Sequence, residues 1–326
     1  MQAQTKQKKQ PETNNLEARI PAPQGYKRVS VAEGSFAHFL RNLPLKPQGS
    51  DLHYYNGQLK ARNYAGAVVD MDFGRNANEQ CADAIIFLRA SYLWKTGQYN
   101  KIVFCFTNGF KAEYAKWAQG YRVRNYNSWV KKQKPDRSYQ SFRKYLHLVF
   151  QYAGTASLSK ELMPIGRCWS ADIQAGDVFI KGGFPGHAEI VVDVAENQQG
   201  QRVVLLAQSF MPAQEIEVFP QWFSASADGT YLVTPAWTFS SPNANTMLLR
   251  RFIGIYADGV SSSKLFKEVI HQHRLMLYPH SLSAIFSLKN LLISSCLLPI
   301  GSFKSARVAL LRSQSTHHLA PFHRKV

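Results

Sequence analysis

The sequence predicts a single α+β domain over residues 16–252, and three observations support this fold class. Residues 78–97 carry apolar side chains every three or four positions, as one face of a helix does. Residues 177–209 alternate apolar and polar side chains on either side of a polar turn, which is the pattern of a β-hairpin. The chain is 45% hydrophobic and 13% aromatic, which is enough to build a packed core.

The chain opens with a polar segment, residues 1–15, which is rich in Gln, Lys and Asn. Such a composition cannot bury enough apolar surface to fold, so we expect a disordered leader. The segment also lacks the apolar stretch of an export signal. We therefore expect either a cytoplasmic protein or a chain whose export segment is missing, and the localisation stays open.

The following elements are predicted from periodicity and turn residues. Phe36, Phe39 and Leu40 have helical spacing, and Pro44 should end that helix because proline disfavours helix in the residue before it. The most regular helix should begin at an N-cap, Asn78, whose side chain can accept a backbone N–H, and stop near Gly97. The remaining predicted elements are a turn within 51–59, strands at 67–73 and 101–107, a partly helical segment at 113–130, and a helix at 141–152.

The hairpin within residues 177–209 carries the most specific prediction. Alternation should place His187, Glu189 and Asp193 on one face of the strand, with Ala188 and Val194 among the residues on the other face. The polar turn should lie at residues 197–201, after which the chain returns. That register places the side chain of Gln208 opposite or diagonal to His187, on the same face.

The C-terminal segment differs from the rest in composition. The chain has a formal net charge of +18, and residues 251–326 contain ten Lys or Arg against two acidic residues. We expect residues 253–326 to be an atypical basic extension that is poorly ordered. Its apolar run at 282–300 is interrupted by Lys289, which disfavours a transmembrane helix. Nucleic acid binding rests on charge alone and is not expected, because no recognition motif accompanies the charge.

Four cysteines are present, without the spacing of a zinc site or of a disulfide framework. Cys81 falls in the first turn of a predicted helix, where the helix dipole stabilises a thiolate, the nucleophilic form of cysteine. The alternative is a packed core cysteine on the apolar stripe of that helix. Cys105 lies in an apolar strand and should be core, and Cys168 is a weaker candidate nucleophile. Asp70 and Asp72 form a separate candidate for an acid/base or metal role, without an evident third ligand.

His187 is the candidate general base. It follows Gly182, Gly183 and Gly186, which could let a substrate backbone approach the ring. A cysteine at a helix N-terminus followed by a histidine on a later strand is the chain order of papain-like cysteine hydrolases. The amide oxygen of Gln208 could accept the ring N–H and hold the ring in place, and Glu189 is the alternative partner.

The phrases AVVDMDFG, QCADAIIFLRASYLW and GDVFIKGGFPGHAEIVVDVA resemble a bacterial family described as domain of unknown function 4846, found largely among Bacteroidota. The resemblance runs from Arg19 to Phe252. It implies no established activity, but many members carry an export signal, which suggests the cell envelope. The helix bearing Cys81 and the following hairpin are also similar to the core of the NlpC/P60 and CHAP cysteine peptidases.

This second likeness implies a papain-like core in which the helix packs on an antiparallel sheet. Cys81 would be the nucleophile, His187 the base and Gln208 the polar orienter, with Gln80 or the backbone N–H of Cys81 in the oxyanion hole. We therefore expect a cysteine hydrolase of amide bonds, acting on peptides or peptidoglycan stem peptides without metal or cofactor. The alternative is a non-catalytic binding or structural module of the envelope. The oligomeric state stays open.

Overall fold

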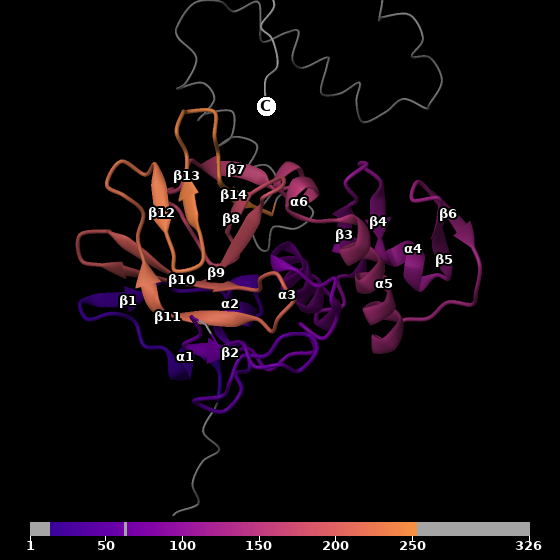
Figure 1. Ribbon diagram of the computed structural model, residues 1–326, viewed down its shortest axis with the longest axis horizontal. Helices are drawn as coiled ribbons and strands as arrows, with labels where there is room; N and C mark the ends of the chain where they lie inside the picture. Colours follow the sequence, from indigo (N-terminus) through magenta and orange to yellow (C-terminus); the bar gives the residue numbers. More distant parts are fainter. Residues whose placement is uncertain (1–13, 62–63, 253–326) are drawn as a thin grey trace, which may run out of the picture. The chain divides into compact units, whose positions relative to one another are not determined.

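The computed structural model describes residues 14–61 and 64–252 (Figure 1). The chain divides into two units, residues 1–262 and 263–326, and the second unit lies outside the described residues. The expected extension at 253–326, its apolar run at 282–300 and the expected leader up to residue 13 also lie outside them. Within the described residues, no helix is both long and apolar enough to cross a bilayer.

A large antiparallel sheet organises the fold and contains the predicted hairpin, which confirms the α+β class. Its strands run in the order β2-β11-β10-β9-β8-β14-β7, and β1 pairs with the far end of β9. The strands are β1 (Tyr26–Arg28), β2 (Ala67–Val68), β7 (Met163–Gly166), β8 (Val178–Lys181), β9 (His187–Asn197), β10 (Arg202–Gln208), β11 (Glu217–Phe223) and β14 (Leu249–Arg251).

Different elements pack on the two faces of this sheet. The helices α1 (Leu16–Arg19), α2 (Phe36–Arg41) and α3 (Cys81–Lys95) belong to the larger apolar cluster, which includes Ile190 of β9. The hairpin of β12 (Tyr231–Val233) and β13 (Thr238–Ser240) belongs to the second cluster, which includes Val191 of the same strand. Because neighbouring residues of a strand point to opposite faces, the two clusters lie on opposite sides of the sheet.

The helix α3 occupies the centre of the domain. The sequence predicts one apolar face, but residues 81–93 of this helix are all buried. One side contacts β9, and the other packs on α5 (Tyr139–Tyr152), where Trp94 stacks on Phe142 at 5.4 Å between ring centroids. A helix that is covered on every side has no solvent-facing polar side, which explains why a single stripe does not describe it.

The start of α3 differs from the prediction. The N-cap is Gln80 and not Asn78, which is exposed in the preceding loop. The backbone N–H of Gln80 donates to Asp83 Oδ2 at 2.9 Å, so the aspartate fixes the first turn from inside the helix. Glu79 holds the loop before the helix, because its Oε2 accepts the backbone N–H groups of Gly74 and Arg75. The helix therefore begins with Cys81 itself.

Most of the segment between α3 and β7, from β3 to α5, forms a separate group of elements at the right of Figure 1, whereas α6 lies beside β8 of the main sheet. The expected strand at 101–107 is shorter, and it pairs with its neighbour in a two-stranded sheet outside the main sheet. The segment 113–130 is helical only over its first residues and continues as a hairpin. The elements are η1 (Tyr99–Lys101), β3 (Val103–Cys105), β4 (Lys111–Glu113), α4 (Tyr114–Ala118), β5 (Tyr121–Arg124), β6 (Ser128–Lys131), α5 and α6 (Thr155–Glu161).

A β-bulge at Val192 changes which residues of β9 share a face. The pairing with β10 shifts between Leu205 and Leu206, opposite this point. As a result Val194 lies in the second cluster, not with Ala188 as predicted. Asp193 is likewise turned away from the His187 face, and it binds Arg28 and Arg41 at 2.6 Å each.

Candidate active site

Cys81 is the first residue of α3, at the N-terminus of the helix. Its side chain is 8% exposed and belongs to neither of the two apolar clusters. At this position the backbone N–H groups of the first turn have no intrahelical acceptor, and the helix dipole is positive. Cys81 therefore lies at the positive end of the helix dipole.

His187 is the first residue of β9, and its ring is held from several sides. Nε2 lies 2.7 Å from Gln208 Oε1, and the Cys81 side chain is near enough to raise the pKa of the ring. Two aromatic rings pack against the imidazole, Phe210 at 5.0 Å and Trp237 at 5.3 Å between centroids. Because the Gln208 oxygen can only accept, Nε2 is the nitrogen that donates in this hydrogen bond.

The side chain of Gln208 is itself oriented by a buried carboxylate that the sequence analysis missed. Gln208 Nε2 donates to Glu217 Oε1 at 2.8 Å, which turns the amide oxygen toward His187. Gln214 Nε2 donates to the same oxygen at 3.0 Å, and Lys60 Nζ donates to Gln214 Oε1 at 2.6 Å. Glu217 is fully buried and ion-pairs with Lys60 at 3.6 Å. The signal available in the sequence was a glutamate at the start of an otherwise apolar strand.

Glu189 supplies a second contact to the imidazole. Its Oε1 lies 3.4 Å from His187 Nε2 and 2.8 Å from the Thr234 hydroxyl. Its Oε2 is buried without a hydrogen-bond partner among the described residues. Burial raises the pKa of this carboxyl group, and the charge of Glu217 raises it further. Both expected partners of His187 therefore lie beside its ring, and Gln208 is the closer of the two.

The environment of His187 favours the charged ring. Burial lowers the pKa of the imidazole, but hydrogen bonds to Cys81 and Glu189 and the charges of these groups outweigh burial and raise the pKa to about 9. At neutral pH the histidine therefore retains a proton when its neighbours carry negative charge. An imidazolium beside the sulfur stabilises the thiolate in turn.

The glycines before His187 have a different role from the one expected. A Cβ on Gly182 would lie 2.2 Å from Ser159 Oγ, and a Cβ on Gly186 would lie 2.4 Å from both Gly183 O and Thr155 Oγ1. These two glycines therefore make room for α6 and for the loop itself, not for a substrate. Only at Gly183, with φ of +114°, is the space around the position open.

The candidate donors to an oxyanion differ in whether their N–H groups already have an acceptor. The backbone N–H of Gln80 is already donated to Asp83. The side-chain amide of Gln80 is half-buried beside the nucleophile. The backbone N–H of Cys81 has no acceptor within its helix because it belongs to the first turn. This N–H and the Gln80 side chain remain the candidates for an oxyanion hole.

The other candidates from the sequence are separate from this site. Burial raises the pKa of Cys168 to about 11, and its thiol donates to the carbonyl oxygen of Thr230 at 3.2 Å. Burial also raises the pKa of Cys105 to about 11, and the charge of Glu161 raises it further. Asp72 is ion-paired with Arg143 at 3.2 Å. Among the described residues, no three His, Cys, Asp or Glu side chains are grouped in a way that could hold a metal ion.

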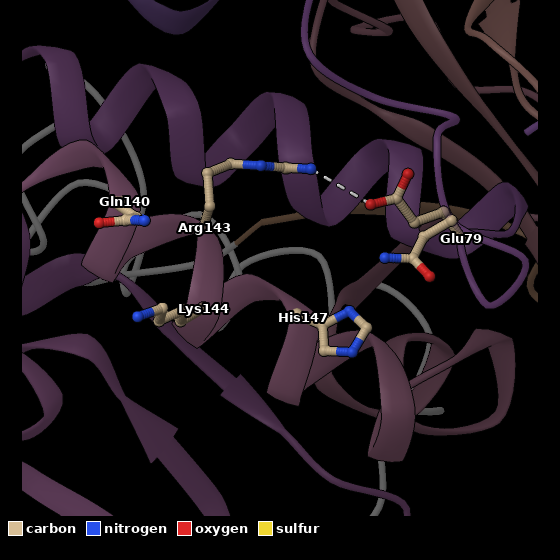
Figure 2. Close-up of a pocket in the computed structure, with 6 residues that line it drawn as sticks. Glu79, Gln140, Arg143, Lys144 and His147 are labelled. Atoms are coloured by element: carbon tan, nitrogen blue, oxygen red, sulfur yellow. Dashed lines mark hydrogen bonds and ion pairs between the residues drawn. The ribbon is translucent and has the colours of Figure 1, made fainter.

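A polar pocket of about 310 Å³ lies between α5 and the loop that leads into Cys81. Figure 2 shows Glu79 and Arg143 pointing toward one another across it, with Nη2 and Oε1 3.2 Å apart, while Gln140, Lys144 and His147 line it from α5. The ion pair connects α5 to the loop before Cys81 and so helps to fix the start of α3.

The fold and site together define an α+β protein in which a cysteine at a helix N-terminus meets a histidine at the start of a strand of an antiparallel sheet. The chain belongs to the family described as domain of unknown function 4846, whose model matches residues 16–245. Comparison with curated proteins gives no match. Comparison with solved structures gives none either.

Proposed function

We propose that this protein is a cysteine hydrolase of amide bonds with a papain-like catalytic arrangement. The observation that carries the proposal is that Gln208, itself oriented by a buried carboxylate, holds the ring of His187, whose pKa the Cys81 side chain raises. A core histidine needs only a hydrogen-bond partner. This one also interacts with a thiol at a helix N-terminus, as a general base would.

The chemistry follows from the positions of these groups. Cys81 Sγ attacks the carbonyl carbon of the amide while its proton resides on His187, and the carbonyl oxygen becomes an oxyanion near the N–H of Cys81. His187 then gives the proton to the leaving nitrogen, and the C–N bond breaks to leave a thioester. Water, deprotonated by His187, attacks the thioester and releases the acid and the free thiol. Gln208 holds the ring in one orientation throughout.

Peptides of the cell envelope, including peptidoglycan stem peptides, are the substrate class that the likeness to NlpC/P60 and CHAP peptidases suggests. The second candidate is a non-catalytic binding or structural module of the envelope. It is favoured by one observation, which is that Cys81 is 8% exposed and His187 only 2% exposed. A substrate carbonyl can reach this pair only where the surrounding loops leave an approach.

The test is the rate of alkylation of each cysteine by iodoacetamide at pH 7, read by peptide mass spectrometry. Cys105 is a control within the same molecule, because it is more exposed than Cys81 but its pKa is about 11. The proposal predicts that Cys81 reacts at least tenfold faster than Cys105 despite its burial. His187→Ala should abolish that advantage, and Cys81→Ala should remove the labelled peptide.

Release of amine from a panel of stem peptides by the wild-type protein, and not by Cys81→Ala, would extend the result to a substrate. If Cys81 reacts more slowly than Cys105 until the protein unfolds, the thiol is core packing. The hydrolase proposal is then wrong, and the non-catalytic module is the better description.

A further inference from the structure

Two loops beside the candidate site expose large apolar side chains. Phe184 is 98% exposed in the loop between β8 and β9, and Met211 is 60% exposed in the loop after β10. They are the two most exposed of the large hydrophobic side chains among the described residues. Folding gains nothing from a phenyl ring that is left in water, and exposed apolar side chains gathered beside a candidate site are a common mark of a binding surface.

Chain geometry ties both side chains to the catalytic pair. Phe184 is three residues before His187, and Met211 is three residues after Gln208. His187 Nε2 and Gln208 Oε1 are 2.7 Å apart. Three residues span at most about 11 Å of extended chain. The strands β9 and β10 are antiparallel neighbours, so the start of one and the end of the other meet at the same edge of the sheet. Both loops therefore flank the imidazole.

The loop that carries Phe184 is held in place by close packing on α6 and by contacts within the loop. Gly182 and Gly186 pack so closely on α6 and on the loop backbone that a Cβ at either position would overlap them. Thr155 of α6 donates its hydroxyl to Gly183 O at 3.3 Å. The ring is thus projected into solvent from a backbone that is packed on both sides of it.

The second loop is braced by the turn at residues 53–59. The backbone N–H of Tyr55 donates to Ala213 O at 2.9 Å, and Tyr54 forms a β-bridge with Gln214. The side chains of Tyr55 and Leu59 are 40% and 54% exposed. Two further exposed apolar side chains therefore lie on the turn that contacts the second loop.

We propose that Phe184, Met211, Tyr55 and Leu59 form an apolar rim that binds the apolar group of the amide substrate next to the scissile bond. The inference rests on the proposed hydrolase function and names the substrate class, an amide that carries an aromatic or alkyl group. The sequences of the two loops, GGFPG at 182–186 and FMPA at 210–213, contain no charged residue in a chain with a net charge of +18. An uncharged rim beside the thiol selects an apolar group over a charged one.

The experiment compares two electrophiles that differ only in their apolar group, N-methyl and N-benzyl chloroacetamide. In each case the sulfur displaces chloride from the CH₂ carbon and forms a thioether. The labelling rate of Cys81 is divided by that of Cys105 in the same molecule, which corrects for the intrinsic reactivity of each reagent. The rim predicts a normalised rate about tenfold higher for the benzyl reagent, an effect that corresponds to burying one or two CH₂ equivalents.

Phe184→Ser and Met211→Ser should each bring this ratio close to one without unfolding the protein, because both side chains are exposed. Tyr126→Ser is the matched control, since Tyr126 is 52% exposed on the distant hairpin of β5 and β6 and should leave the ratio unchanged. A ratio near one in the wild type, or a ratio that the two loop variants do not alter, overturns the inference while rapid labelling of Cys81 still supports the hydrolase. Slow labelling by both reagents overturns both.

A bilayer is the competing partner for exposed apolar loops. Co-sedimentation with vesicles of phosphatidylcholine and phosphatidylglycerol separates the two. Loss of sedimentation in Phe184→Ser and Met211→Ser, with the benzyl preference retained, would assign the loops to a membrane surface and overturn the substrate rim.

Discussion

The pKa of His187 makes the stability of the fold depend on pH. The pKa rises from the ordinary value of 6.5 to about 9 in the folded protein, because the hydrogen bonds and charges of Cys81 and Glu189 outweigh burial. The folded state therefore binds a proton more tightly than the unfolded chain, so the stabilisation is complete below pH 6.5 and is lost as the pH rises through 9. At roughly 1.4 kcal/mol for each pH unit, the loss between these values is about 3 kcal/mol.

Urea unfolding at pH 6.5 and pH 9, in the presence of a reductant, measures this loss. We expect the free energy of unfolding of the wild type to fall by about 3 kcal/mol between the two values, and that of His187→Gln to fall much less. Cys81→Ala keeps the histidine but removes one group that raises its pKa, so its fall should be intermediate. An equal fall in the wild type and in His187→Gln would refute the reasoning, because other groups would then cause the pH dependence.

Three further predictions concern single side chains. Asp193→Ala should lower the free energy of unfolding by about 3–5 kcal/mol in urea, because it leaves the guanidinium groups of two arginines without their buried carboxylate. An unchanged midpoint would show that these ion pairs do not stabilise the fold. Gly186→Ala should slow alkylation of Cys81 about tenfold or more by displacing His187, whereas Gly154→Ala, at a position where the added Cβ meets nothing within 4 Å, should not. Similar rates for both variants would contradict this effect. Glu217→Leu should slow the same alkylation about tenfold, because the Gln208 amide loses the acceptor that sets its orientation. A wild-type rate would show that Gln208 does not need Glu217.

The elements that the sequence predicted well are those defined by neighbouring residues. The helices near residues 36–41 and 139–152 and the hairpin of β9 and β10 follow from local periodicity and turn chemistry. The order of strands in the sheet could not be predicted, because it joins β14 to β7 and β8, which are far from it in the chain. The bulge at Val192 was also missed, since alternation alone assumes an unbroken strand.

The residues of the candidate site likewise divide into those that the local sequence predicts and those that it does not. Gln208 was found as a partner of His187 because both lie on one hairpin, whose register brings their side chains together. Glu217 was missed because it comes from β11, a strand whose pairing with β10 has no signal in the local sequence. Asn78 was chosen as the N-cap because its side chain is a common cap, but the carboxylate of Asp83, inside the helix, binds the backbone N–H of Gln80.

The single extra residue at Val192 lets one strand serve two unrelated purposes. Before it, Glu189 points to the ring of His187. After it, Asp193 points to the arginines that join the N-terminal strand and helix to the sheet. With an uninterrupted strand the two carboxylates would point to the same face of the sheet. The bulge separates them, so mutation can change the end of the strand that carries His187 while the other end keeps its own partners.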